Sequence, residues 1–185
     1  MKKSRNLWLG MMLMMAAVCV GCNDDNGVIT HGDLTLYAVA RQSADASLQY
    51  KAEMPLFSLN NIKSYNPETG ELVFENVVFD KHLFYDAGCQ YRVFFYDGDH
   101  LLFDARAVSF FSSIGYFSDL TFQCSCFGPG DEFDASESHF YIRYGYPGTI
   151  MGDETVKALM EKNAAGMERF VTILRQAGKI VNTKL

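Results

Sequence analysis

The spacing of apolar residues changes once along this chain, at about residue 150, and this change limits the fold more than any other feature of the sequence. Before it, short runs alternate apolar and polar side chains, which is the period of a strand. After it, apolar residues recur at every third or fourth position, the spacing of an amphipathic helix. Strands followed by one helix predict an α+β, mainly β domain. We expect an antiparallel sheet or sandwich of about seven strands, with no parallel sheet and with the C-terminal helix packed on one face.

The predicted helix has a signal at each end. Asp153 is the expected N-cap and Gly178 the expected C-terminal stop. Ala164 to Gly166 interrupts the apolar stripe, and a glycine costs about 1 kcal/mol in a helix interior. We therefore expect a kink or a break into two helices near Gly166. The stripe itself consists of Val156, Leu159, Met160, Met167, Phe170, Val171 and Leu174.

A hairpin over residues 91–108 is the clearest local prediction. Two apolar and aromatic arms flank Asp97 to Asp99, and Asp-Gly between strand-forming residues is the strongest short-range hairpin signal. Phe94, Tyr96 and Leu102 add apolar groups to the second face of these arms. The hairpin is therefore expected in the middle of the sheet, with both faces at least partly covered.

The remaining strands are bounded by turn residues. Asn66 to Gly70 predicts a second hairpin turn, because proline presets φ and glycine accepts a positive φ. The alternation slips near Glu75, which predicts a bulge, and Pro55 places its segment at an edge or outside the sheet. Gly145 to Gly148 is expected to end the last strand. These strands are predicted at residues 33–41, 47–52, 71–79, 120–126 and 140–144, and the strict alternation in 120–126 indicates a half-buried strand.

The first 22 residues have the parts of an export signal that ends in a cysteine. Three basic residues in the first five positions precede an apolar run to Val20, which is too short to span a bilayer. Val20-Gly21-Cys22 resembles the lipobox of bacterial lipoproteins, with Cys19 where that motif usually has leucine. The resemblance implies that residues 1–21 are a signal peptide and that Cys22 is lipidated. An ordinary secretory signal beside a coincidental cysteine is the alternative.

The segment after the cysteine is polar and acidic, so residues 22–27 are expected to form a lipidated tether and residues 28–185 a single globular domain. Asp24 and Asp25 resemble the acidic signal that follows the lipidated cysteine in many Bacteroidetes lipoproteins sent to the outer face of the outer membrane. The resemblance implies an outer membrane lipoprotein on the periplasmic or cell-surface side, with the two aspartates favouring the surface. A tether that is simply hydrophilic is the alternative.

Net charge limits the partners. Removing residues 1–21 from the 185 leaves 164 residues, and the loss of the three leader cations moves the formal charge from −6 to −9. A surface this acidic repels phosphates, which argues against nucleic acid and against a basic membrane-docking face. Attachment to the membrane is therefore expected through lipid, and stable anchoring needs two acyl chains or more.

Three thiols remain in the body of the chain, at Cys89, Cys124 and Cys126. Cys124 and Cys126 lie two apart on one predicted strand, about 7 Å between Cα atoms, so a disulfide between them is not expected. Either could pair with Cys89, or the three could form a thiolate metal site, although Cys-x-x-Cys spacing is absent. Small buried apolar residues are the favoured interpretation. No cofactor or metal is predicted.

No common catalytic signature occurs in the sequence. A Cys-His hydrolase would need a thiol beside His82, His100 or His139, and the spacing selects no such pair; His31 also lies outside any motif. Asp131 to Ser138 reads as an acidic loop whose carboxylates could bind Ca²⁺, but it lacks the EF-hand pattern and a solvated loop is favoured. The chain is thus more readily interpreted as a non-enzyme than as an enzyme.

An aromatic cluster closes the last predicted strand. Tyr141, Arg143, Tyr144 and Tyr146 are candidate ligand-binding residues, since tyrosine and arginine are common at binding hot spots. Alternatively, Phe140, Ile142 and Tyr144 face the core and only Tyr141 and Arg143 lie outside. The leading hypothesis is a membrane-anchored, non-catalytic binding or accessory module with a protein or glycan partner. The alternatives are a hydrolase of an envelope or dietary polymer and an inhibitor of secreted enzymes.

Overall fold

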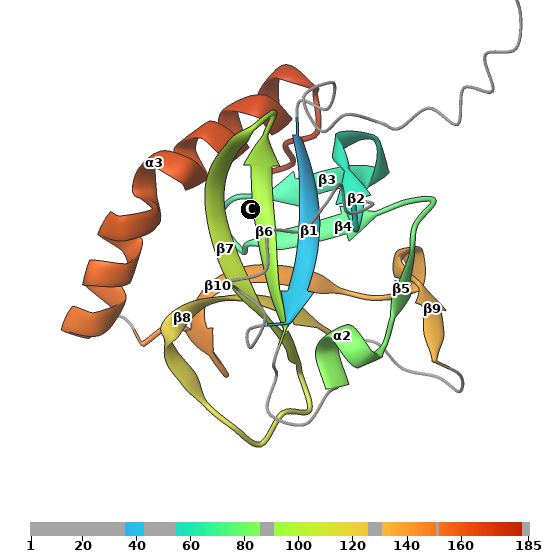
Figure 1. Ribbon diagram of the computed structural model, residues 1–185. Coiled ribbons are helices and arrows are strands. Elements are labelled where there is room, and N and C mark those ends of the chain that lie inside the picture. Colours follow the sequence, from blue (N-terminus) through green and yellow to red (C-terminus); the bar gives the residue numbers. More distant parts are fainter. Residues whose placement is uncertain (1–35, 43–54, 86–90, 126–130, 151, 183–185) are drawn as a thin grey trace, which may run out of the picture.

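The computed structural model describes residues 36–42, 55–85, 91–125, 131–150 and 152–182 (Figure 1). The predicted leader, Cys22, the tether and the strand at 47–52 lie outside the described residues. So do His31, Cys89 and Cys126.

Eight strands form one sheet in the order β2-β1-β6-β7-β8-β10-β4-β3, and β5 pairs with β9 in a second, two-stranded sheet. In the described ranges one long helix, α3, packs against the sheet, so the fold is α+β and mainly β, as predicted. The strands are β1 (Leu36–Gln42), β2 (Phe57–Ser58), β3 (Ile62–Asn66), β4 (Glu71–Phe74), β5 (Val78–Asp80), β6 (Tyr91–Asp97), β7 (His100–Ser109), β8 (Tyr116–Cys124), β9 (Glu132–Asp134) and β10 (Phe140–Tyr146). The helices are η3 (Leu59–Asn61), α2 (His82–Tyr85), η4 (Ala135–Glu137) and α3 (Glu154–Gln176).

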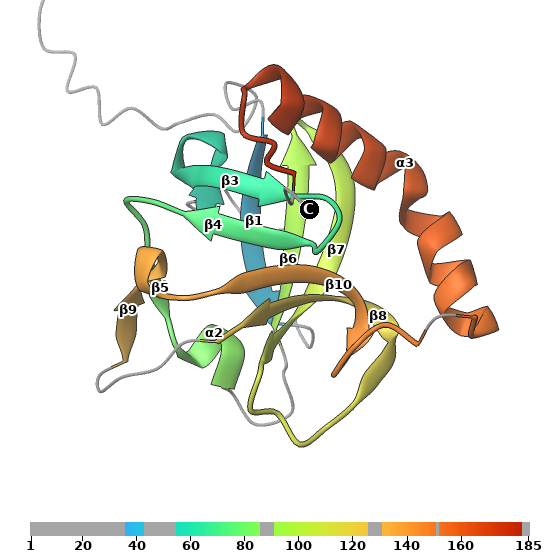
Figure 2. The same ribbon diagram turned by 180° about the vertical axis from the view of Figure 1, so that it is seen from behind.

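The large sheet curls until its two edges approach each other (Figures 1 and 2). Its edge strands β2 and β3 are joined only by η3, and the rings of Phe57 on β2 and Phe74 on β4 lie 4.7 Å apart. The curl encloses a core that is dominated by aromatic rings. Among the described residues, nine phenylalanines are buried there: Phe57, Phe74, Phe79, Phe84, Phe95, Phe103, Phe122, Phe140 and Phe170.

The predicted hairpin over residues 91–108 is confirmed. Strands β6 and β7 pair antiparallel up to Asp97 opposite His100, and Gly98 in the turn has a φ of 55°. The hairpin lies in the interior of the sheet, between β1 and β8, and α3 packs against β7. The ion pair between Arg169 and Asp97, 2.6 Å, ties the helix to the hairpin turn.

The turn over residues 66–70 is also confirmed, since it connects the antiparallel strands β3 and β4. Gly70 has a φ of 74°, and a Cβ there would come within 2.2 Å of the Ile142 carbonyl oxygen, so no larger residue fits. The bulge predicted near Glu75 is wrong. Instead β4 ends at Phe74, Asn76 takes a φ of 55°, and β5 leaves to pair with β9 in the other sheet.

The acidic segment 131–138 is not a plain loop, which corrects the prediction. Strand β9 pairs antiparallel with β5 over residues 132–134, and η4 follows with Asp134 as its N-cap. The Asp134 carboxylate accepts a hydrogen bond from the Ser136 amide, 2.8 Å, which lowers the pKa of that carboxyl group. This aspartate therefore has a local structural role.

Strands β7 and β8 pair parallel, which also differs from the prediction. Every other neighbouring pair in the sheet is antiparallel. Strand β8 begins at Tyr116, earlier than expected, and it is not half-buried, because Thr121 and Gln123 are as inaccessible as Phe122 and Cys124 on the core side. The position of Cys124 in the core fits the interpretation of a small buried apolar residue.

Helix α3 spans residues 154–176 as one continuous element, so of the two alternatives predicted near Gly166, a kink or a break into two helices, the break is wrong. Both views show the helix axis bending part-way along as it follows the curved sheet. Asp153 caps the helix through hydrogen bonds from the amides of Thr155 and Val156, and Gly178 follows the last turn with a φ of 70°. Among the described residues, no helix is long and apolar enough to span a membrane.

The chain after α3 runs back along the outer edge of β3. Tyr65 forms a parallel bridge with Ile180, through hydrogen bonds of the Tyr65 backbone to Lys179 and Val181. The Lys179 ammonium group also donates to the Ile62 carbonyl oxygen. The edge of β3 is therefore covered by the last residues that the structure describes.

Candidate functional site

The four predicted site residues lie on β10, but their side chains do not share one face of the sheet. Phe140 and Ile142 are buried in the core, and Tyr144 packs against it, partly buried. Burial raises the pKa of the Tyr144 hydroxyl. Tyr141 and Arg143, on the alternate positions, occupy the opposite face of the sheet, called here the outer face. The structure thus matches the alternative in which only Tyr141 and Arg143 lie outside.

Tyr146 has a structural role on the outer face. The positive φ of Gly145, 85°, accompanies a register shift between β10 and β8, which places Tyr146 in a small buried cluster with Val108. Its hydroxyl lies 2.8 Å from the Phe110 carbonyl oxygen and 3.0 Å from that of Ser112. Because the side chain is buried and engaged in this way, Tyr146 anchors the loop after β7 and is not positioned to contact a ligand.

Tyr141 and Arg143 form a stacked pair. The Arg143 guanidinium lies 4.1 Å from the centroid of the Tyr141 ring, and the Phe110 ring packs against the same tyrosine at 5.5 Å. The Arg143 Nε donates to the Thr69 carbonyl oxygen, 3.4 Å. Cation–π contact and ring packing hold these side chains in place before any partner arrives.

A glutamate borders this pair. Glu71 lies opposite Tyr141 in the β4–β10 ladder, and its carboxylate is 3.2 Å from the His139 Nδ1. Burial, the charge of Glu71 and a hydrogen bond to it raise the pKa of the Tyr141 hydroxyl, although Arg143 opposes the shift. The tyrosine is therefore protonated at neutral pH.

The loop between β7 and β8, which begins at Phe110, carries exposed apolar side chains. Phe111 and Ile114 in this loop are 55% and 48% exposed, and Phe117, at the start of β8, is 46% exposed. We call the surface formed by Phe110, Phe111, Ile114, Phe117, Tyr141 and Arg143 the β10 patch. The phenylalanines and the isoleucine of this patch were not predicted as part of a site, although the sequence contains a usable signal: positions 107 to 118 contain no charged residue and include four aromatic ones.

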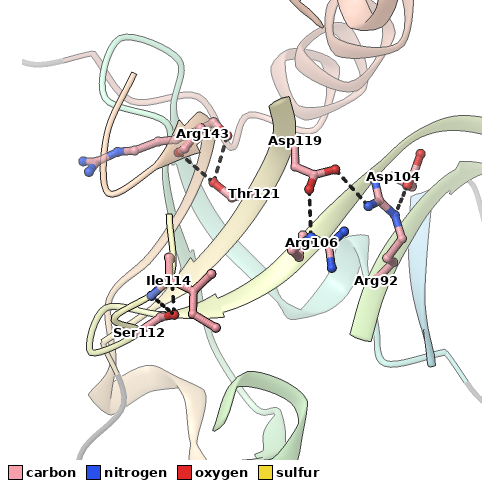
Figure 3. A network of polar contacts seen from close by, with 9 residues as sticks. Arg92, Asp104, Arg106, Ser112, Ile114, Asp119, Thr121 and Arg143 are labelled. Carbon is pink, nitrogen blue, oxygen red and sulfur yellow. Dashed lines mark hydrogen bonds and ion pairs between the residues drawn. The ribbon is translucent and has the colours of Figure 1, made fainter. Parts of the chain in front are cut away.

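Local hydrogen bonds satisfy much of the backbone of this loop. The Ser109 hydroxyl accepts from the Phe111 amide, 3.1 Å, and the Ser112 hydroxyl accepts from the Ile114 amide, 3.2 Å, as Figure 3 shows for the second contact. The Tyr146 hydroxyl lies within hydrogen-bond distance of two further carbonyl groups. A loop fixed in this way loses little conformational entropy when it binds.

A charged network lies beside the patch on β6, β7 and β8 (Figure 3). Asp119 accepts from Arg92, 3.0 Å, and from Arg106, 2.8 Å, and Arg92 also pairs with Asp104. Burial raises the pKa of Asp119, but the hydrogen bonds and charges of the two arginines outweigh burial, so the net pKa is lowered. Each arginine of this network is paired with an aspartate. The network therefore has a structural role, because it links three neighbouring strands.

Beneath the patch, the outer face of β8 carries a buried polar group. The Gln123 amide donates to the Thr121 hydroxyl, 2.8 Å, and to the Gly145 carbonyl oxygen, 3.1 Å. Thr121 in turn contacts the carbonyl oxygens of Arg143 and Gly145. These contacts fix the backbone of β10 where it carries Arg143.

The residues considered for chemistry are dispersed. The three histidines are exposed: His82 lies on α2, His100 on β7, and His139 just before β10. Cys124 is buried in the core, whereas the neighbouring Ser125 amide donates to the His139 carbonyl oxygen, 3.0 Å, and the His139 side chain is exposed. Within the described ranges, no three His, Cys, Asp or Glu side chains converge in a way that could hold a metal ion.

Comparison of the chain with protein-family models, with curated proteins and with solved structures finds no match.

Proposed function

We propose that this chain is a lipid-anchored envelope lipoprotein, attached through Cys22, that binds a protein partner without catalysis through the β10 patch. The anchor rests on the resemblance of Val20-Gly21-Cys22 to a lipobox and on the acidic residues after it. The binding role rests on one observation: large apolar side chains are exposed on a fixed loop and at the start of β8, and Phe110 of the same loop packs against a pre-stacked tyrosine–arginine pair.

The composition of the patch favours a protein as partner. Interface cores are depleted in charged residues and enriched in aromatic residues and arginine, and hot spots are rich in tyrosine and arginine. The patch has one charged residue, Arg143, and four aromatic rings. A glycan is less favoured because sugar rings need an open aromatic face, whereas Tyr141 is already covered by Arg143 and packed against Phe110.

The position of the patch supports this proposal. In both views the start of β1 lies at the top of the molecule and the loop between β7 and β8 at the bottom (Figures 1 and 2). A tether that precedes β1 would thus join the domain at the end opposite the loop. The patch would then be accessible to a partner on the side away from the attachment point.

An inhibitor of a secreted enzyme is a second candidate, favoured by the rigidity of the same loop. Protease inhibitors reach high affinity with interfaces of ordinary size partly because their binding loops are preorganised. The loop after β7 has this character, since Ser109, Ser112 and Tyr146 hold its backbone. Loss of activity of a secreted enzyme on addition of the chain would distinguish this role from simple attachment.

The test is capture of partners from envelope fractions with the double variant Tyr141→Ala/Phe117→Ser. Both positions are in the patch, so capture should fall at least tenfold while the melting temperature changes little. Leu101→Ser is the matched control, because Leu101 is 51% exposed on the hairpin and lies outside the patch. Equal capture by the double variant and the parent would remove the patch from the function.

A further inference from the structure

Arg143 differs from Arg92, Arg106 and Arg169 in what it contacts. Arg92 and Arg106 each bind aspartate carboxylates, and Arg169 on α3 binds Asp97. Among the residues that the structure describes, Arg143 has no carboxylate within ion-pair distance; its contacts are the Tyr141 ring and the Thr69 carbonyl oxygen. Figure 3 shows its side chain extending away from the Asp119 network.

Stacking determines what the guanidinium can still bind. One flat face lies over the Tyr141 ring, and Nε is directed to Thr69, so the two terminal nitrogens keep their in-plane N–H groups for another acceptor. Two parallel N–H groups in a plane match the two oxygens of a carboxylate. Because the ring already fixes the side chain, binding loses less side-chain entropy than it would with a free arginine.

The nearby charges select the class of anion. Sites for phosphate groups commonly use clusters of arginines, but Arg143 is the one cation of the patch, and the Glu71 carboxylate borders it. A dianion would be repelled by Glu71 more strongly than a monoanion. The site therefore fits a single carboxylate.

We propose that Arg143 binds an aspartate or glutamate side chain of the protein partner, while Phe111, Ile114 and Phe117 contact apolar residues that flank this acidic residue. The inference rests on the proposed function and adds the chemistry of the partner. An acidic side chain bordered by apolar ones complements the patch in both charge and polarity. The acidic chain as a whole would repel such a partner, so Arg143 also fixes where it can dock.

The test is selection of random twelve-residue peptides on the chain extracted from membranes in detergent. Peptides retained by the parent should share an Asp or Glu beside aromatic or aliphatic residues. Selection on Arg143→Gln should lose the acidic position and keep the apolar ones. The best peptide should bind Arg143→Gln about tenfold more weakly than the parent, in line with loss of a hydrogen-bonded charge pair. Arg143→Lys should show an intermediate loss, because lysine keeps the charge but not the paired donors.

Two controls keep the outcomes distinct. Arg175→Gln removes an exposed arginine on α3, outside the patch, and should leave peptide binding unchanged. Peptides without an acidic position, or equal binding to parent and Arg143→Gln, would overturn the carboxylate assignment. If binding also survives Tyr141→Ala/Phe117→Ser, the proposed function fails as well.

Displacement of the peptides by trigalacturonate at lower concentration than by a free acidic peptide would assign the site to acidic glycans and overturn the protein assignment.

Discussion

At the scale of single residues, Gly166 shows how a residue that weakens a helix can be required by packing. Glycine is a poor helix former, and the sequence alone predicts a kink or a break into two helices near this residue. The structure shows a continuous helix that crosses β7 so closely that a Cβ at position 166 would lie 2.0 Å from the Leu102 carbonyl oxygen. The absence of a side chain therefore sets the distance between helix and sheet.

Gly166→Ala should destabilise the protein, although alanine favours helix by about 1 kcal/mol. The added methyl group meets backbone, which cannot rotate away, and overpacking of this kind costs about 1 to 3 kcal/mol. Ala165→Gly at the neighbouring exposed position is the control and should lose about 1 kcal/mol through helix propensity alone. Chemical denaturation measures both. A more stable Gly166→Ala protein would contradict the close contact.

Phe170 tests how α3 contributes to the core. It is fully buried, and its ring contacts Tyr65 at 5.2 Å, Phe103 at 5.5 Å and Phe95 at 5.8 Å. Phe170→Ala should cost about 3 to 5 kcal/mol and lower the melting temperature on the order of 10 °C. Met160→Ala, on the same helix but 40% exposed, should have a small effect. Unchanged melting of Phe170→Ala would show that the helix does not stabilise the sheet.

At the scale of elements, the Asp119 network holds together the parallel pair β7–β8 and the neighbouring strand β6. Arg92 on β6 and Arg106 on β7 converge on one carboxylate of β8. A parallel pair of strands is slightly less stable per residue than an antiparallel one. The ion pairs of Asp119 therefore add stability at β7–β8, where the backbone pairing alone is weakest.

Asp119→Asn should destabilise the domain at neutral pH by about 1 to 3 kcal/mol, because two charge-assisted hydrogen bonds are weakened. The folded-state pKa of Asp119 is lowered, so its contribution is present above the unfolded-state pKa and is lost as the pH falls through the folded-state pKa. The difference in stability between parent and variant should therefore shrink in acid. Denaturation curves over a pH series measure this difference. A constant difference at all pH values would exclude an ionic role for Asp119.

The elements that could be predicted from sequence are those with local causes. The Asp-Gly turn of the β6–β7 hairpin, the Asp153 cap and the period of α3 each depend on residues close in the chain. The parallel pairing of β7 with β8 and the pairing of β5 with β9 depend on distant segments, which no short pattern encodes. The alternation of side chains along a strand predicts that Tyr141 and Arg143 share the outer face. The same alternation does not predict the position of Tyr146, because the register of β10 shifts at Gly145.

At the scale of the whole molecule, the proposed anchor and the β10 patch make separate predictions. Cys22→Ala should abolish incorporation of a labelled fatty acid and release the protein from the membrane fraction, since burial of acyl chains supplies the attachment. Because Cys22 precedes the described domain, the melting temperature should be unchanged. Cys124→Ala, in the core, is the control that should keep the label. Label retained by Cys22→Ala would refute the anchor.

The segment that follows α3 limits self-association of the protein, because it covers one edge of the sheet. An exposed sheet edge is a template on which a second molecule can add its own strand. Here β2 is only two residues long, and residues 179–181 occupy the edge of β3 through the backbone of Tyr65. The C-terminal residues thus block this edge. A chain that ended at Gln176 would present an open edge, and at high concentration such chains would be prone to stack into fibrils.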